Sequence, residues 1–197
     1  KYSLGDTGEL LSAVEGWYQN RYGVTLQDDE ILSLAGSQEG FAHVALTLCD
    51  PGDVVLVPNP GYPVFEAGPF LNDAKIAYYE LDKTNHYAPA LDKIPEELAK
   101  KAKMMVVSYP LNPTCTCIEK ADYEKIIAFA KKYNIAIIHD NAYSEIEYDG
   151  RTGFSFLSVP GAKEVGIEFN SLSKTYNLTG IRISFALGNK ELIQKFK

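Results

Sequence analysis

Short apolar runs alternate with helical stretches along most of the sequence. The apolar runs predict strands at 30–35, 53–57, 75–79, 103–108, 134–139, 165–170 and 182–187. Between them, segments 40–48 and 122–132 have the 3.6-residue periodicity of amphipathic helices. This alternation is typical of an α/β fold with a doubly wound, mostly parallel sheet, here of seven strands.

A further helix is expected near the beginning of the chain. Asp6 and Glu9 have the spacing of a capping box, and apolar residues recur on one helical face until Gly23. At the other end, segment 189–197 has the pattern of a starting helix without a cap after it, and the sequence has no initiator methionine. We therefore interpret residues 1–197 as a piece of a longer protein.

The composition argues against several classes of protein. The 197 residues carry 19 basic and 26 acidic side chains, a net charge of −7, which disfavours nucleic acids and acidic membrane surfaces as partners. No apolar run is long enough to span a bilayer, so we expect a cytoplasmic protein. The spacings of the three cysteines and three histidines predict neither a disulfide framework nor a metal site.

Chemistry is expected in the loops at the carboxyl ends of the strands, where open α/β sheets bind their ligands. One such loop, Gly36-Ser37-Gln38, opens a helix whose free N–H groups and dipole favour a phosphate. A later loop holds Lys174 and Arg182, and a guanidinium group can clamp a phosphate bidentately. Taken alone, the first loop is more often a tight turn, and the lysine is more often a solvated side chain.

Three further loops each present one group suited to a planar ring. Tyr62 lies in a proline-rich loop and can stack on a flat heterocycle. Asn112 is held between prolines as an amide donor for a phenolic oxygen. Asp140 ends a buried strand, where a carboxylate needs a cation or a donor. The structural alternatives are ordinary packing, an Asn-Pro turn and a helix N-cap, respectively.

These five structural alternatives would have to coincide at one edge of a single sheet. One ligand explains all five loops if it carries a phosphate, a planar ring, a phenolic oxygen, a basic ring nitrogen and an aldehyde that reacts with a lysine. Pyridoxal phosphate has these groups. We therefore predict that the chain binds pyridoxal phosphate.

The motifs resemble those of the class I and II aminotransferases, pyridoxal-phosphate enzymes of fold type I. The most specific are Asp-x-Ala-Tyr from Asp140 to Tyr143 and Ser-x-Ser-Lys ending at Lys174, with Arg182 eight residues beyond the lysine. Asn-Pro-Thr at Asn112 and the Gly36 loop add order and spacing.

The resemblance extends over residues 2–197 and has implications for domain organisation. The loops at 59–63 and 176–180 are similar to those of the branch that includes LL-diaminopimelate and aspartate aminotransferases. The resemblance implies that residues 1–197 form the cofactor-binding large domain, truncated before the C-terminal small domain. It also implies a homodimer for the full-length form.

The resemblance assigns a role to each motif residue. Lys174 would form the internal aldimine and carry a proton from the substrate Cα, Asp140 would keep the ring nitrogen protonated, and Tyr143 would hold the phenolic oxygen. The implied cofactor-binding residues are Gly36, Ser37, Gln38, Tyr62, Asn112, Asp140, Tyr143, Ser171, Ser173, Lys174 and Arg182. Tyr2 would reach the phosphate of a neighbouring subunit. Because Lys174 must be neutral to accept a proton, we expect it to be buried near Arg182.

The implied activity is ping-pong transamination between a small amino acid and a 2-oxo acid. Two alternatives keep the cofactor: a lyase or decarboxylase on the same motifs, and a non-catalytic module that senses pyridoxal phosphate. A nucleotide-binding domain is disfavoured because the sequence has neither Gly-x-Gly-x-x-Gly nor a Walker lysine loop.

Three residues depart from the family pattern. Cys115 and Ser184 stand where glycine is usual, so we expect strain in the turn or crowding of the cofactor. Ile181 replaces a common tryptophan. The arginine that binds the substrate α-carboxylate is expected in the missing C-terminal part, so this piece alone should turn over poorly.

Overall fold

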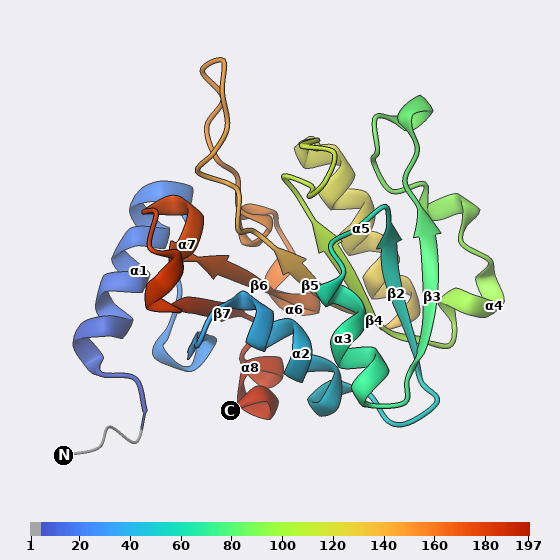
Figure 1. Ribbon diagram of the computed structural model, residues 1–197, viewed down its shortest axis with the longest axis horizontal. Helices are drawn as coiled ribbons and strands as arrows, with labels where there is room; N and C mark the ends of the chain where they lie inside the picture. The colour runs from blue at the N-terminus through green and yellow to red at the C-terminus, as the bar shows by residue number, and fades with distance from the viewer. Residues whose placement is uncertain (1–4) are drawn as a thin grey trace.

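The computed structural model describes residues 5–197. Its seven strands form one sheet in the order β1-β7-β6-β5-β4-β2-β3 (Figure 1). The strands are β1 Ile31–Leu34, β2 Val54–Asn59, β3 Lys75–Glu80, β4 Ala102–Ser108, β5 Ala136–Asp140, β6 Gly166–Ser171 and β7 Ser184–Gly188. Each begins and ends within two residues of its predicted position, so the seven predicted strands are confirmed.

Strand direction brings one set of loops to a single edge of the sheet. β2 pairs in parallel with β3 and β4, and β5 pairs in parallel with β4 and β6. β7 is antiparallel to both β6 and β1. The carboxyl ends of β1 to β6 and the start of β7 therefore lie at the same edge. This confirms the doubly wound, mostly parallel α/β fold.

Helices cover both faces of the sheet. α1 (Gly8–Tyr22) and α5 (Lys120–Tyr133) contribute to the hydrophobic cluster on one face, while α2 (Ser37–Leu48), α3 (Val64–Leu71) and α8 (Lys190–Phe196) contribute to the other (Figure 1). The short helices are α4 Glu96–Ala99, α6 Ala162–Val165 and α7 Leu172–Thr175. Among the described helices, none is both long and apolar enough to cross a membrane.

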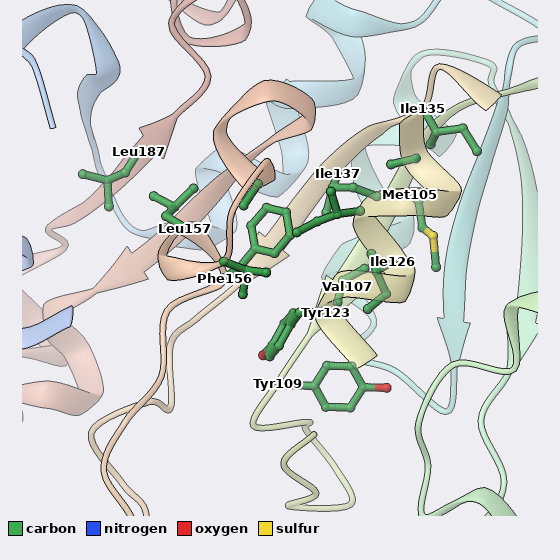
Figure 2. Close-up of a cluster of buried hydrophobic side chains, with 14 of the residues drawn as sticks. Met105, Val107, Tyr109, Tyr123, Ile126, Ile135, Ile137, Phe156, Leu157 and Leu187 are labelled. Atoms are coloured by element: carbon green, nitrogen blue, oxygen red, sulfur yellow. The ribbon is translucent and has the colours of Figure 1, made fainter. Parts of the chain in front are cut away.

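β4 shows why the central strands appear in the sequence as continuous apolar runs. Met105 and Val107 pack in the cluster beneath α5, which Figure 2 shows, whereas Met104 and Val106 pack in the cluster beneath α2. A strand buried on both faces has no polar alternation, which is typical of parallel sheets. The buried core therefore fixes the position of the loop that follows β4.

The beginning of α1 differs from its prediction. Thr7, not Asp6, is the N-cap, and its Oγ1 accepts a hydrogen bond of 3.3 Å from the Leu10 amide. The Asp6 carboxylate instead accepts bonds from the amide, at 3.0 Å, and the hydroxyl of Ser33 in β1. The predicted capping box at Asp6 is therefore wrong, because a threonine can cap the helix and leave the carboxylate to bind the strand. The predicted end at Gly23 is confirmed, with φ at +67°.

Candidate active site

A cavity of about 190 Å³ lies at the edge of the sheet where the strands end. It is lined by Ser37, Gln38, Tyr62, Asn112, Asp140, Ala142, Tyr143, Ser171, Ser173, Lys174, Thr179 and Arg182. The structure thus brings together every predicted site residue except Gly36, which instead lies against the Arg182 side chain. Tyr2 lies outside the described residues.

Two lining residues, Ala142 and Thr179, were missed by the sequence analysis. Thr179 Oγ1 donates to the Ser173 carbonyl at 3.2 Å, and the Thr179 carbonyl accepts from Arg182 Nη1 at 3.0 Å. Thr179 therefore links the two halves of the lysine-arginine segment. The one feature of the sequence that could have indicated a role for Thr179 is its position between Lys174 and Arg182.

One end of the cavity brings together groups that suit an anion. Gly36 precedes α2 with φ at +99°, and a Cβ placed there would lie 2.0 Å from Nη2 of Arg182. Only glycine lets the backbone approach the guanidinium group this closely. The first turn of α2 adds free N–H groups and the positive end of the helix dipole. Ser37 and Gln38, in that first turn, line the cavity.

We expect Gly36→Ala to disrupt this end of the site. The substitution forces a left-handed backbone conformation on alanine, which destabilises the protein by about 1–3 kcal/mol, and it displaces the flexible Arg182 side chain. Gly180→Ala is the matched control, because a Cβ there meets nothing within 4 Å. Chemical denaturation of both variants measures the difference. Equal losses of stability would contradict the backbone strain at Gly36.

Asp140 is the buried carboxylate of the site. It ends β5 and accepts one hydrogen bond, from the Ala142 amide at 3.2 Å. Burial raises the pKa of Asp140 to about 6, although the neighbouring His139 lowers it. No helix begins directly after Asp140, so the N-cap alternative does not apply. A buried carboxylate with one donor is suited to a cationic ligand atom.

Tyr143, Asn112 and Tyr62 surround the middle of the cavity. Burial raises the pKa of Tyr143, and a hydrogen bond with the Asn112 side chain opposes that shift. Gln38 Nε2 donates to Tyr62 Oη at 2.6 Å, which connects the aromatic loop to the start of α2. These groups supply an aromatic ring and two donors for an oxygen on a planar ligand.

Lys174 lies in the short helix α7, and its Nζ lies 5.8 Å from the centre of the Tyr143 ring. The side chain is exposed, so the expected burial of Lys174 is wrong, whereas Arg182 lines the same cavity as expected. The physical reason is that α7 is a single turn at the rim of the sheet, where only Ser173 faces the interior. The Ser171 hydroxyl caps this turn by accepting from the Ser173 amide at 3.2 Å.

The three residues that depart from the family pattern differ in their effect on the structure. Cys115 has φ at +59°, so the expected strain at this usual glycine position is present. Ser184 has no positive φ, so backbone strain there is not found. Its buried hydroxyl has no hydrogen-bond partner among the described residues. Ile181 is 55% exposed.

A larger cavity of about 1030 Å³ adjoins the first and shares Asn112 and Tyr143 with it. Cys115, Glu147 and Arg151 also line it. Among residues 5–197, no cluster of histidine, cysteine and acidic side chains could hold a metal ion.

The residues of the smaller cavity fit pyridoxal phosphate. The glycine cradle at Arg182 suits a phosphate, the buried Asp140 suits a basic ring nitrogen, and Lys174 supplies an amine at the rim. The fold and this set of groups define a cofactor-binding domain of the doubly wound class.

Comparisons with known proteins identify the family. The model of the class I and II aminotransferases matches residues 2–197, so the chain belongs to this pyridoxal-phosphate-dependent family. An LL-diaminopimelate aminotransferase from Syntrophobacter fumaroxidans is 46% identical over 192 residues, 97% of this chain and 50% of that protein. Another, from Aquifex aeolicus, is 47% identical over 94% of this chain and 48% of that protein. The chain therefore spans about half the length of the curated relatives it matches.

Solved structures with the same fold include an aminotransferase. Apo-BacF from Bacillus subtilis superposes with a TM-score of 0.97 at 39% identity, covering 100% of this chain and 50% of that one. An aminotransferase from Staphylococcus aureus has a TM-score of 0.96 at 36% identity, covering 100% of this chain and 52% of that one.

Proposed function

We propose that residues 1–197 form the cofactor-binding large domain of an aminotransferase that moves an amino group from an amino acid to a 2-oxo acid. The observation that carries the proposal is the convergence of Lys174, Asp140 and the Arg182 cradle on one cavity. Membership of the aminotransferase family supports the reaction class.

Each part of the cavity has a proposed partner on the cofactor. Arg182 and the first turn of α2 would hold the phosphate, together with the hydroxyl groups of Ser171 and Ser173. Asp140 would pair with the ring nitrogen. Tyr143 and Asn112 would bind the phenolic oxygen, and Tyr62 would lie against the ring.

The proposed chemistry depends on one proton transfer. Pyridoxal phosphate, when bound, supplies an aldehyde and an electron-withdrawing ring. Lys174 is the proposed base: it would take the proton from the substrate Cα and pass it to the cofactor carbon that carried the aldehyde. Asp140 would keep the ring nitrogen protonated, which favours loss of that proton. An oxo acid leaves before the second substrate binds, as in a ping-pong mechanism.

The names of similar proteins suggest a substrate. Relatives at 46–48% identity are named LL-diaminopimelate aminotransferases, so we propose diaminopimelate as the amino donor. The arginine for the substrate α-carboxylate is proposed to lie outside these residues. A cytoplasmic homodimer is the proposed form of the complete enzyme.

Cofactor titration followed by borohydride reduction tests the proposal. We expect pyridoxal phosphate to bind the full chain and reduction to leave a phosphopyridoxyl group on the peptide that contains Lys174. Mass spectrometry maps the modified residue. In a separate, unreduced sample of the complete enzyme, LL-diaminopimelate and 2-oxoglutarate should yield glutamate. Label on other lysines alone would contradict the site, and release of ammonia without glutamate would contradict the reaction.

A further inference from the structure

A fully buried carboxylate, Glu168, lies in β6 on the face of the sheet covered by α1. It accepts hydrogen bonds of 2.8 Å from Tyr18 Oη, Ser155 Oγ and the Phe156 amide. His139 Nδ1 lies 3.1 Å from it. A buried carboxylate is costly unless its lone pairs are satisfied, and four groups from three other parts of the chain satisfy this one.

The same network holds the strand that ends at Asp140. His139 immediately precedes Asp140, and successive residues of a strand point to opposite faces. His139 is therefore held between Glu168 and Tyr123, whose Oη lies 3.2 Å from Nε2, while Asp140 lines the cavity on the other face. A displacement of His139 displaces the backbone that carries Asp140.

α1 also binds the segment that follows the site. Tyr22 Oη lies 2.8 Å from Ser144 Oγ and donates to Glu145 at 3.0 Å. Arg21 forms an ion pair of 2.9 Å with Glu145. Tyr18 and Tyr22 are four residues apart and so share one face of the helix. α1 therefore contacts the residues after the turn from Asp140 to Tyr143 directly, and it reaches the residue before that turn through Glu168.

We propose that Tyr18 and Tyr22 are positioning residues that hold the turn from Asp140 to Tyr143 in place from the opposite side of the sheet. Tyr18 acts through Glu168 and His139, and Tyr22 acts through Ser144 and Glu145. The effect on cofactor binding rests on the proposed function, whereas the hold on the turn does not.

Electrostatics supports the connection between the two faces. Burial is the largest cause of the raised pKa of Asp140. The neighbouring His139 opposes that shift, and the charge of Glu168 adds to it. The buried network therefore affects the charge of Asp140 as well as its position.

Hydrogen exchange of the cofactor-free full chain tests the hold directly. Tyr18→Phe removes one buried hydroxyl, and Tyr79→Phe is the matched control, because its hydroxyl donates to the Val106 carbonyl at 2.6 Å and does not contact the turn. We expect exchange in the peptide 140–146 to be about tenfold faster in Tyr18→Phe and unchanged in Tyr79→Phe. Tyr22→Phe, a partly buried site, should also accelerate it.

Cofactor affinity supplies the second measurement. We expect Tyr18→Phe to raise the Kd of pyridoxal phosphate about tenfold, and to raise it less when Asp140→Asn is already present, because part of its effect passes through that carboxylate. Exchange that is equal in all three tyrosine variants would overturn the inference, as would a full tenfold rise in Kd in the Asp140→Asn background. If exchange changes as expected but the chain binds no pyridoxal phosphate, the positioning of the turn by Tyr18 and Tyr22 is supported and the proposed function is contradicted.

Discussion

Replacing Lys174 with alanine is expected to lower transamination by at least about 10³-fold. The variant loses the amine that the cavity presents at its rim, and with it the group proposed to move the substrate proton. Single-turnover measurements with LL-diaminopimelate would detect the loss. Because the side chain is exposed, the fold should remain intact.

One further variant separates proton transfer by the amine from the effect of a positive charge, and a second serves as the control. Lys174→Arg keeps the positive charge, but a guanidinium group stays protonated and cannot accept a proton, so we expect it to be as inactive as Lys174→Ala. Lys190→Ala changes an exposed lysine at the start of α8 and should retain parental activity. Activity of Lys174→Arg near the parental level would refute proton transfer by this residue.

The fold could be predicted because its central strands are buried on both faces. Such strands appear in the sequence as apolar runs, and the order of runs and helices indicated the doubly wound sheet. The same logic led to the loops where the strands end, including those that hold Tyr62, Asn112 and Asp140. The position of Arg182 followed as well, since β7 begins at the edge where the parallel strands end.

The features that the sequence did not predict depend on contacts between segments that are far apart in the chain. The cap at Thr7 and the bond of Asp6 to Ser33 were decided by tertiary structure, which local spacing does not contain. The exposure of Lys174 depends on which elements cover the rim of the sheet. Glu168 carried one signal, a charged residue inside an apolar run, but its partner Tyr18 lies 150 residues away.

The substitution Asp140→Asn is expected to stabilise the cofactor-free protein and to impair the enzyme. Burial raises the pKa of Asp140 from 3.8 to about 6. The folded state therefore holds this proton more tightly than the unfolded state. The resulting stability is fully present below about pH 4 and is lost as the pH rises through about 6. A difference of two in pKa corresponds to about 3 kcal/mol of stability.

Asparagine has nearly the same shape as aspartate and keeps an oxygen for the Ala142 amide, but it does not ionise. Urea denaturation should therefore show Asp140→Asn to be more stable than the parent by about 3 kcal/mol at pH 8, and equally stable below about pH 4. Asp92→Asn, at an exposed site, should change stability by less than about 0.5 kcal/mol at either pH. Transamination by Asp140→Asn should fall about 10²-fold, because the ring nitrogen loses its anionic partner. A stability gain that does not depend on pH would show that ionisation of Asp140 is not its source.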